Sequence, residues 1–181
     1  MITRDMKALR DELADGIARP IPEDARELMQ AMCDYLTGKR HREVHLRFAP
    51  FPPGTASGLW VDSVDLGDMI IVEERVPPEH QMVIFGHEVW HMVAGHCSSS
   101  SLAGGTAAAR YLESQEGLAD IVRHVAAARS GDIDHQETEA ESFGYLLGAA
   151  WRERLTRRES NLDMSVAAHR LQMSLGLVDK I

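Results

Sequence analysis

The chain has 181 residues, 44% of them hydrophobic and 26% charged, a composition that fits one globular domain and excludes a disordered or fibrous protein. Its 19 Lys and Arg against 28 Asp and Glu leave a net charge of −9, which argues against a protein that mainly binds nucleic acid or anionic lipid. Its two cysteines, Cys33 and Cys97, form neither a disulfide framework nor a zinc knuckle, so a reduced, cytoplasmic protein is expected.

The first forty residues predict two amphipathic helices. Apolar residues recur at helical spacing within residues 3–17, and a second apolar stripe lies within residues 25–36. Pro22 marks the start of the second helix, and Lys39 and Arg40 mark its end with the positive charge that a helix C-terminus favours. Both helices are expected to contribute one face to the core.

Between residues 44 and 72 the apolar period changes to the alternation of a β-strand. Three such runs lie at 44–48, 59–62 and 69–72, and they predict a small three-stranded sheet. The last two runs are joined by a short turn that contains Gly67, so they are expected to form an antiparallel hairpin. The stretch 50–58, rich in Pro and Gly, predicts a longer loop.

Helices are expected again from residue 77 onward. Pro77 and Pro78 mark the start of a helix that runs to about Gly95 and is too apolar for a surface position. Further helices are expected at roughly 106–129, 134–158 and 162–175, with breaks at Gly131 and near Asn161. The predicted fold class is therefore α+β, with the small sheet packed on the apolar helix.

The sequence predicts neither secretion nor membrane insertion. The N-terminal segment is charged throughout and lacks the apolar core of a signal peptide, and no run reaches the roughly 18 apolar residues of a membrane span. We predict a single domain over residues 1–181, with its core at about 22–158 and a C-terminal helical extension at 159–181.

The apolar helix contains the strongest chemical signal in the chain. His87 and His91 are four residues apart, so both imidazoles lie on one helical face, with Glu88 beside them. Two neutral histidines can hold Zn²⁺ and leave positions for a third protein ligand and a water. A glutamate next to them can take the proton of that water during attack on a peptide carbonyl. This spacing predicts zinc ligands at His87 and His91 and a catalytic role for Glu88.

The third metal ligand is not fixed by the same motif. An extended template with a third histidine would need one at residue 97, which is Cys97, and His96 is one position short. Because His96 follows Gly95, a residue that commonly ends helices, it is expected to be a cap or loop histidine rather than a ligand.

A carboxylate on a later helix remains, and two segments offer one: Glu116, with Asp120 one turn on, and Glu137, with Glu141 one turn on. The second acid of each pair can hydrogen-bond a ligating imidazole. Glu137 is favoured because small residues on its stripe would let that helix press closely against the zinc helix; these are Ala140, Gly144 and Gly148. Glu116 stays open, and a capping box that begins at Asp134 would also explain Glu137.

Four residues could stabilise the negative charge that develops on a reacting carbonyl oxygen. They are Tyr111, His124, His135 and Tyr145, and the sequence does not choose among them. Each also has an ordinary structural or solvated role available.

The order of a small sheet, an IFGHEVWHMVAGH helix and an ETEAESFGYLL helix, over roughly residues 25–150, resembles the ImmA/IrrE family of gluzincin-type metallopeptidases. The resemblance implies a minimal zincin-like fold, with His87, His91 and Glu137 as zinc ligands and Glu88 as the catalytic glutamate. It also implies cleavage of a helix-turn-helix repressor inside the cell, in some members within a toxin–antitoxin, stress-response or mobile-element system. Two features depart from the family: the connection between the motifs is longer than usual, and Glu141 stands where Asn or Asp is common.

These signals lead to one main function and two rivals. The main hypothesis is a cytoplasmic zinc-dependent endopeptidase that holds an extended substrate along an edge strand of the sheet. The first rival is a regulatory protein that keeps the zincin scaffold but binds a partner, such as a transcription regulator, without cleaving it. The second is a nucleic-acid contact through four arginines, and it is disfavoured by the interleaved acids and the acidic chain; the arginines are Arg152, Arg154, Arg157 and Arg158.

Overall fold

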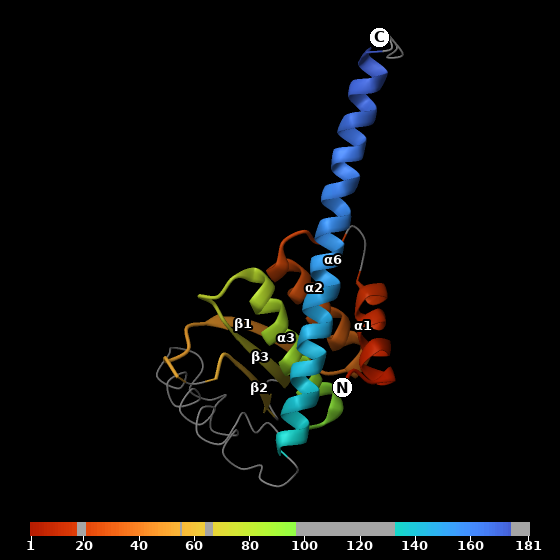
Figure 1. Ribbon diagram of the computed structural model, residues 1–181. Coiled ribbons are helices and arrows are strands. Elements are labelled where there is room, and N and C mark those ends of the chain that lie inside the picture. The colour runs from red at the N-terminus through yellow and green to blue at the C-terminus, as the bar shows by residue number, and fades with distance from the viewer. Residues whose placement is uncertain (18–20, 55, 64–66, 97–132, 175–181) are drawn as a thin grey trace. The chain divides into compact units, whose positions relative to one another are not determined.

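A computed structural model describes residues 1–17, 21–54, 56–63, 67–96 and 133–174 of the chain. Within these residues the fold is α+β, with four helices and one small three-stranded mixed sheet (Figure 1). The chain divides into two compact units, Met1–Gly148 and Ala149–Ile181, and the whole sheet belongs to the first. The α+β class expected from the sequence is confirmed.

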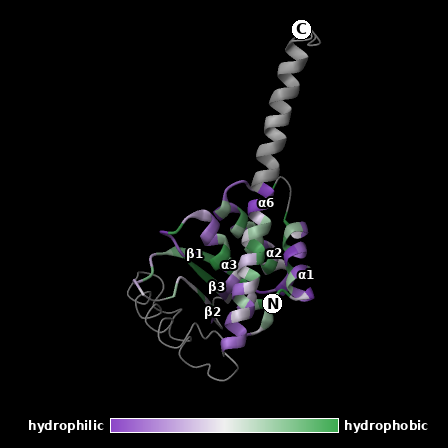
Figure 2. Ribbon diagram, viewed as in Figure 1, coloured by the Kyte–Doolittle hydropathy of each residue, from purple (hydrophilic) through white to green (hydrophobic). Residues whose placement is uncertain are grey.

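The first two helices are α1 (Arg4–Gly16) and α2 (Ala25–Arg40). Asp24 caps α2, since its side chain accepts hydrogen bonds from the first free backbone N–H groups of the helix. Both predicted apolar stripes are buried; they comprise Met6, Leu9, Leu13 and Ile17 at α1 and Ala25, Leu28, Met29, Met32 and Leu36 on α2, where Cys33 is buried as well. Burial raises the pKa of the Cys33 thiol to about 12, so this cysteine is unreactive. Figure 2 shows hydrophilic and hydrophobic residues together on α1.

The sheet consists of β1 (Val44–Ala49), β2 (Gly58–Ser63) and β3 (Gly67–Glu73), in the order β1-β3-β2. The predicted hairpin is confirmed, because β2 runs antiparallel to β3. β1 pairs with the other edge of β3 and runs parallel to it, so the sheet is mixed. The central strand is buried along almost its entire length, and β2 is left as an edge strand.

The third helix, α3 (Pro78–Ala94), packs against β2 and β3 on one side and against α2 on another. It begins directly after Pro77 and ends where Gly95 adopts a left-handed conformation with φ 67°, as its sequence predicts. Ten of its residues are buried, a high proportion for a helix of 17 residues. The expected packing of the sheet on this apolar helix is confirmed.

The last helix, α6 (Ile133–Ser174), continues for 42 residues, so the predicted break near Asn161 is wrong. The stretch 149–175 contains neither Gly nor Pro. Asn in a helix interior lowers helix stability by only about 0.6 kcal/mol relative to Ala. A polar residue alone is therefore too weak a signal to end a helix.

The predicted helix at 106–129 and the break at Gly131 lie outside the described residues. No helix in the described part of the chain combines the length and apolar character that a membrane crossing requires.

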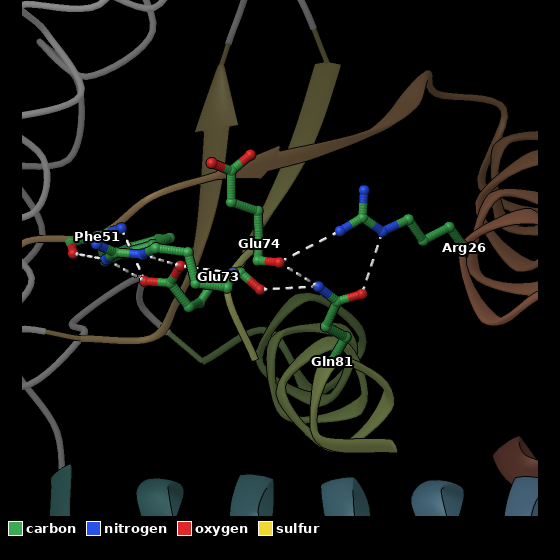
Figure 3. Close-up of polar contacts among 6 residues, drawn as sticks. Arg26, Phe51, Glu73, Glu74 and Gln81 are labelled. Atoms are coloured by element: carbon green, nitrogen blue, oxygen red, sulfur yellow. Dashed lines mark hydrogen bonds and ion pairs between the residues drawn. The ribbon is translucent and has the colours of Figure 1, made fainter. Parts of the chain in front are cut away.

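A polar network joins the end of β3 to α2 and α3 (Figure 3). The buried carboxylate of Glu73 accepts hydrogen bonds from the backbone N–H of Phe51, at 2.9 Å, and from the backbone and guanidinium of Arg75. Gln81 on α3 donates to the backbone carbonyl of Glu73 and accepts from Arg26 on α2, both at 3.2 Å. The hydrogen bonds that the Glu73 carboxylate accepts, chiefly those from Arg75, lower its pKa to about 2.

Candidate metal centre

Two histidines of α3 form the base of the site. His87 and His91 lie one helical turn apart, and their Nε2 atoms are 3.0 Å from each other. The side chain of His87 is 22% exposed and that of His91 is 8% exposed, so the pair sits at the boundary between core and solvent.

Glu137, in the first turns of α6, completes the group. Its Oε2 lies 3.4 Å from Nε2 of His87, and its Oε1 lies 3.6 Å from Nε2 of His91. The structure therefore brings together the three residues predicted as ligands. Glu116, the alternative ligand, lies outside the described residues together with Cys97. Asp134 lies inside α6 rather than at its N-cap, so a capping box that starts there does not account for Glu137.

The distances within this group match the demands of a small tetrahedral cation. Bonds of about 2.0–2.2 Å from zinc to nitrogen or oxygen place two tetrahedral ligand atoms about 3.3 Å apart. The three separations measured between His87, His91 and Glu137 run from 3.0 to 3.6 Å. Two imidazoles and one carboxylate are also a donor set that suits zinc. The group could hold a metal ion.

Small residues let α6 approach α3 closely enough to deliver Glu137. A methyl group on Gly86 would lie 3.0 Å from the Cα of Gly144, and one on Gly148 would lie 2.7 Å from a side-chain carbon of Val83. The predicted stripe of small residues on α6 thus does face the histidine-bearing helix. A larger side chain at Gly144 would meet the backbone carbonyl of Val83 and push the two helices apart.

Glu88 lies beside the metal group and is buried, with 6% of its surface exposed. Burial raises the pKa of its carboxyl to about 7, and the negative charge of Glu137 adds to the rise. The backbone N–H of Trp60, on β2, donates a hydrogen bond to the carboxylate and partly offsets the rise. A hydrogen-bonding partner from the sheet's edge strand was not foreseen from the sequence.

β2 crosses very close to this carboxylate. A methyl group on Gly58 would lie 2.6 Å from Oε1 of Glu88 and 2.6 Å from Ile84 on the same helix, so only glycine fits the crossing without a shift. Trp60 is itself held in place, because its indole N–H donates to the buried carboxylate of Asp68 at 3.0 Å. The same carboxylate pairs with Arg40 at 3.1 Å.

A cavity of about 280 Å³ opens over the metal group. It is bounded by the start of β2, by α3 and by α6; the lining residues are Ala56, Ser57, Gly58, His80, Val83, Ile84, His87, Glu88, His91, Glu137, Glu141 and Tyr145. Of the predicted oxyanion-stabilising residues, Tyr145 lines this cavity and His135 does not. Tyr111 and His124 lie outside the described residues.

Glu141 lines the cavity, but within the described residues no hydrogen bond joins it to either histidine, contrary to the expectation for an acid one turn beyond Glu137. Burial lowers the pKa of His87, but the hydrogen bond that its ring donates to Glu137 and the charges of Glu88, Glu137 and Glu141 together raise it above the usual value. Burial lowers the pKa of His91, so this ring is neutral and has a lone pair for a metal.

His96 follows the C-cap Gly95, and its backbone N–H donates to the carbonyl of His91, so it is the cap or loop histidine that the sequence predicts. The sequence did not predict its side-chain contact, in which Nδ1 of His96 lies 3.3 Å from Nδ1 of His91. The signal that could have predicted this contact is Gly95, because a left-handed glycine turns the chain back toward the helix it ends.

Searches with protein-family models, against curated proteins and against solved structures found no match to the chain.

Proposed function

We propose that the protein is a zinc-dependent endopeptidase of the cytoplasm. One observation carries the proposal: the His87, His91 and Glu137 group lies at the base of an open cavity with the buried carboxylate of Glu88 beside it. This is the arrangement that metal-assisted hydrolysis requires, with three protein ligands, space for a substrate and a proton acceptor close to the metal.

Zinc held by this group would supply Lewis-acid activation of a water molecule and of the carbonyl to be attacked. Glu88 then acts as the general base, because its carboxylate takes the proton of the attacking water and passes it to the leaving amine. Without a metal, burial raises the pKa of this carboxyl to about 7; the positive charge of a bound zinc would lower the pKa and favour the carboxylate that accepts the proton. The N–H of Trp60 fixes the orientation of the carboxylate during both transfers.

The edge strand β2 offers a place for an extended peptide. The backbone N–H of Glu73 donates to the carbonyl of Ser57, so Ser57 and, by alternation, Leu59 direct their main-chain groups toward β3. Gly58 and Asp62 accordingly direct theirs toward the other side, where β2 has no strand partner within the described residues. A substrate strand added there would run past the mouth of the cavity.

The resemblance to the ImmA/IrrE family extends the proposal to the identity of the substrate. It suggests a protein partner, in particular a helix-turn-helix transcriptional repressor that the enzyme cleaves in a toxin–antitoxin or stress-response system. Direct binding of nucleic acid is not part of the proposed function.

The test compares wild-type protein with Glu88→Gln and with Glu79→Gln, a matched change at an exposed position of the same helix. Each protein is loaded with zinc, assayed for metal content and incubated with a peptide library digested from a bacterial proteome. New peptide ends are then identified by mass spectrometry. We expect about one zinc per chain in all three proteins and cleavage by wild type and Glu79→Gln, with a loss of about 10²–10⁴-fold in Glu88→Gln.

Three outcomes would count against the proposal. A folded wild-type protein that takes up no zinc would remove the metal from the mechanism. Zinc binding with equal cleavage by wild type and Glu88→Gln would remove the assigned general base. If zinc binds but the biological output is undiminished in Glu88→Gln, the regulatory protein that binds without cleaving becomes the better account.

A further inference from the structure

A second set of polar groups lies behind His91, on the side opposite to the metal group. The two nitrogens of this imidazole face different partners: Nε2 faces His87 and Glu137, whereas Nδ1 lies 3.3 Å from Nδ1 of His96. The rings of His91 and His96 meet edge to face, with centroids 5.3 Å apart. His91 therefore directs one nitrogen at the metal group and the other at His96.

The end of α3 explains how His96 reaches this position. Gly95 adopts φ 67°, and the backbone N–H of His96 donates to the carbonyl of His91 at 3.0 Å. This capping turn reverses the chain and returns residue 96 to the helix at the level of residue 91. The His96 side chain is only 11% exposed, so it is packed against the helix rather than extended into solvent.

Glu139 continues the set from the other helix. Its Oε2 lies 3.5 Å from Nε2 of His96, and its side chain is 25% exposed. α6 thus supplies two acids to His91 by different routes: Glu137 approaches the Nε2 side directly, and Glu139 approaches the Nδ1 side through His96. These acids are two positions apart in the sequence, so the same turns of α6 place both.

The contacts of the ring nitrogens determine which nitrogen of His91 and of His96 carries the hydrogen. A His91 that offers the lone pair of Nε2 to a metal carries its hydrogen on Nδ1, and that hydrogen needs an acceptor. His96 can accept at Nδ1 only when its own hydrogen is on Nε2, where it faces the carboxylate of Glu139. One neutral tautomer of each ring satisfies both contacts. The carboxylate of Glu139 favours this pair of tautomers, because it can accept the hydrogen on Nε2 of His96.

We infer that His96 and Glu139 are positioning residues that hold His91 in the orientation and tautomer needed to bind the metal. The inference rests on the proposed metal site and adds two residues that the sequence motif does not contain. A hydrogen bond from a ligating imidazole to an outer partner fixes the ring and makes its other nitrogen a stronger donor. Loss of such a partner lowers metal affinity by about 10- to 100-fold.

The experiment measures the dissociation constant for Zn²⁺ by competition with a chelating dye. The variants are His96→Phe, which keeps a ring but removes both nitrogens, Glu139→Ala, and the double variant; His45→Phe, at an exposed position on β1, is the matched control. We expect zinc affinity to fall about 10- to 100-fold in His96→Phe and to a lesser extent in Glu139→Ala. His45→Phe should bind zinc like wild type.

The double variant separates a relay from two independent effects. Because Glu139 acts through His96, adding Glu139→Ala to His96→Phe should lower zinc affinity no further. Thermal unfolding of the metal-free proteins gives the structural control, and we expect it to stay within a few degrees of wild type. The visible absorption of the Co²⁺-loaded proteins gives a second readout, since a reoriented His91 changes the ligand field.

The outcomes distinguish this inference from the function on which it rests. Zinc affinity of His96→Phe equal to that of wild type would overturn the inference and leave the metal site intact. Additive losses in the double variant would overturn the relay through His96. A wild-type protein without measurable zinc affinity would overturn the proposed function and the inference together.

Discussion

Glu73 and Glu88 are two glutamates with little exposed surface and with opposite shifts in pKa. They are 7% and 6% exposed, yet the pKa of Glu73 is lowered to about 2 and that of Glu88 is raised to about 7. Glu73 accepts hydrogen bonds from two backbone N–H groups and from the guanidinium of Arg75. Glu88 accepts one backbone hydrogen bond and lies near a second carboxylate, Glu137.

The difference shows that desolvation and the number of hydrogen-bond donors together decide the pKa of a buried carboxylate. A glutamate with a full set of donors is a fixed anion that ties elements of the fold together. A glutamate that is buried with too few donors holds its proton until near neutral pH, a property that serves proton transfer and costs stability. Glu73 therefore belongs to the framework of the fold, whereas Glu88 has the property that the proposed general base requires.

The sharpest test of this division compares the same substitution at the two positions. Glu73→Gln should lower the free energy of unfolding by about 2–4 kcal/mol. The reason is that the amide lacks the negative charge to which Arg75 and two backbone N–H groups donate hydrogen bonds. Glu88→Gln should leave it unchanged or raise it slightly, since the neutral amide relieves a buried, poorly partnered carboxylate. Urea unfolding of the zinc-free proteins at pH 7 measures both. Equal destabilisation by the two changes would contradict the division.

A second test uses the pH dependence of stability. The pKa of Glu73 is lowered in the folded chain, so its contribution is complete above its unfolded value of about 4.5 and is lost as pH falls toward about 2. Solvent screens part of this effect because Arg75 is 55% exposed, and about 2 kcal/mol remains. The stability difference between wild type and Glu73→Gln should therefore shrink between about pH 5 and pH 2. A difference that stays constant over this range would exclude Glu73 as its source.

A third and smaller effect tests the crossing of β2 over Glu88. Gly58→Ala forces a methyl group to within 2.6 Å of both Glu88 and Ile84, so we expect a loss of about 1–2 kcal/mol in the free energy of unfolding. Gly38→Ala is the matched control, because the added methyl on α2 would have no neighbour within 4 Å apart from the adjoining backbone of its own helix. That change should be neutral or stabilise by up to about 1 kcal/mol. Similar effects at the two positions would show that the crossing is looser than the structure has it.

Much of this fold was predictable because its signals are local. Alternating apolar residues located the strands, Pro77 and Gly95 bounded α3, and the spacing of His87 and His91 located the base of the site. Even the long-range position of Glu137 had a local sign, since the small residues beside it allowed close helix packing.

The remaining features depend on contacts that leave no local pattern. The parallel pairing of β1 with β3 joins segments separated by the whole of β2, so periodicity in either strand does not reveal it. The contact of His96 with His91 depends on the reversal at Gly95, which also suits an ordinary helix end. The continuity of α6 past Asn161 reflects the weakness of a single polar residue as a stop signal.

The hydrogen bond from Trp60 to Glu88 uses an atom that nineteen of the twenty amino acids also possess. A scan that replaces one side chain at a time would therefore pass over this contact, because only proline at position 60 removes the donor. Such a scan would detect Asp68, which accepts a hydrogen bond from the indole of Trp60, and Gly58, which leaves space for the crossing of β2. It would assign to these side chains an effect on Glu88 that the backbone N–H of Trp60 produces. Replacing the amide N–H of residue 60 by an ester oxygen, through chemical synthesis or suppressor methods, addresses the contact directly.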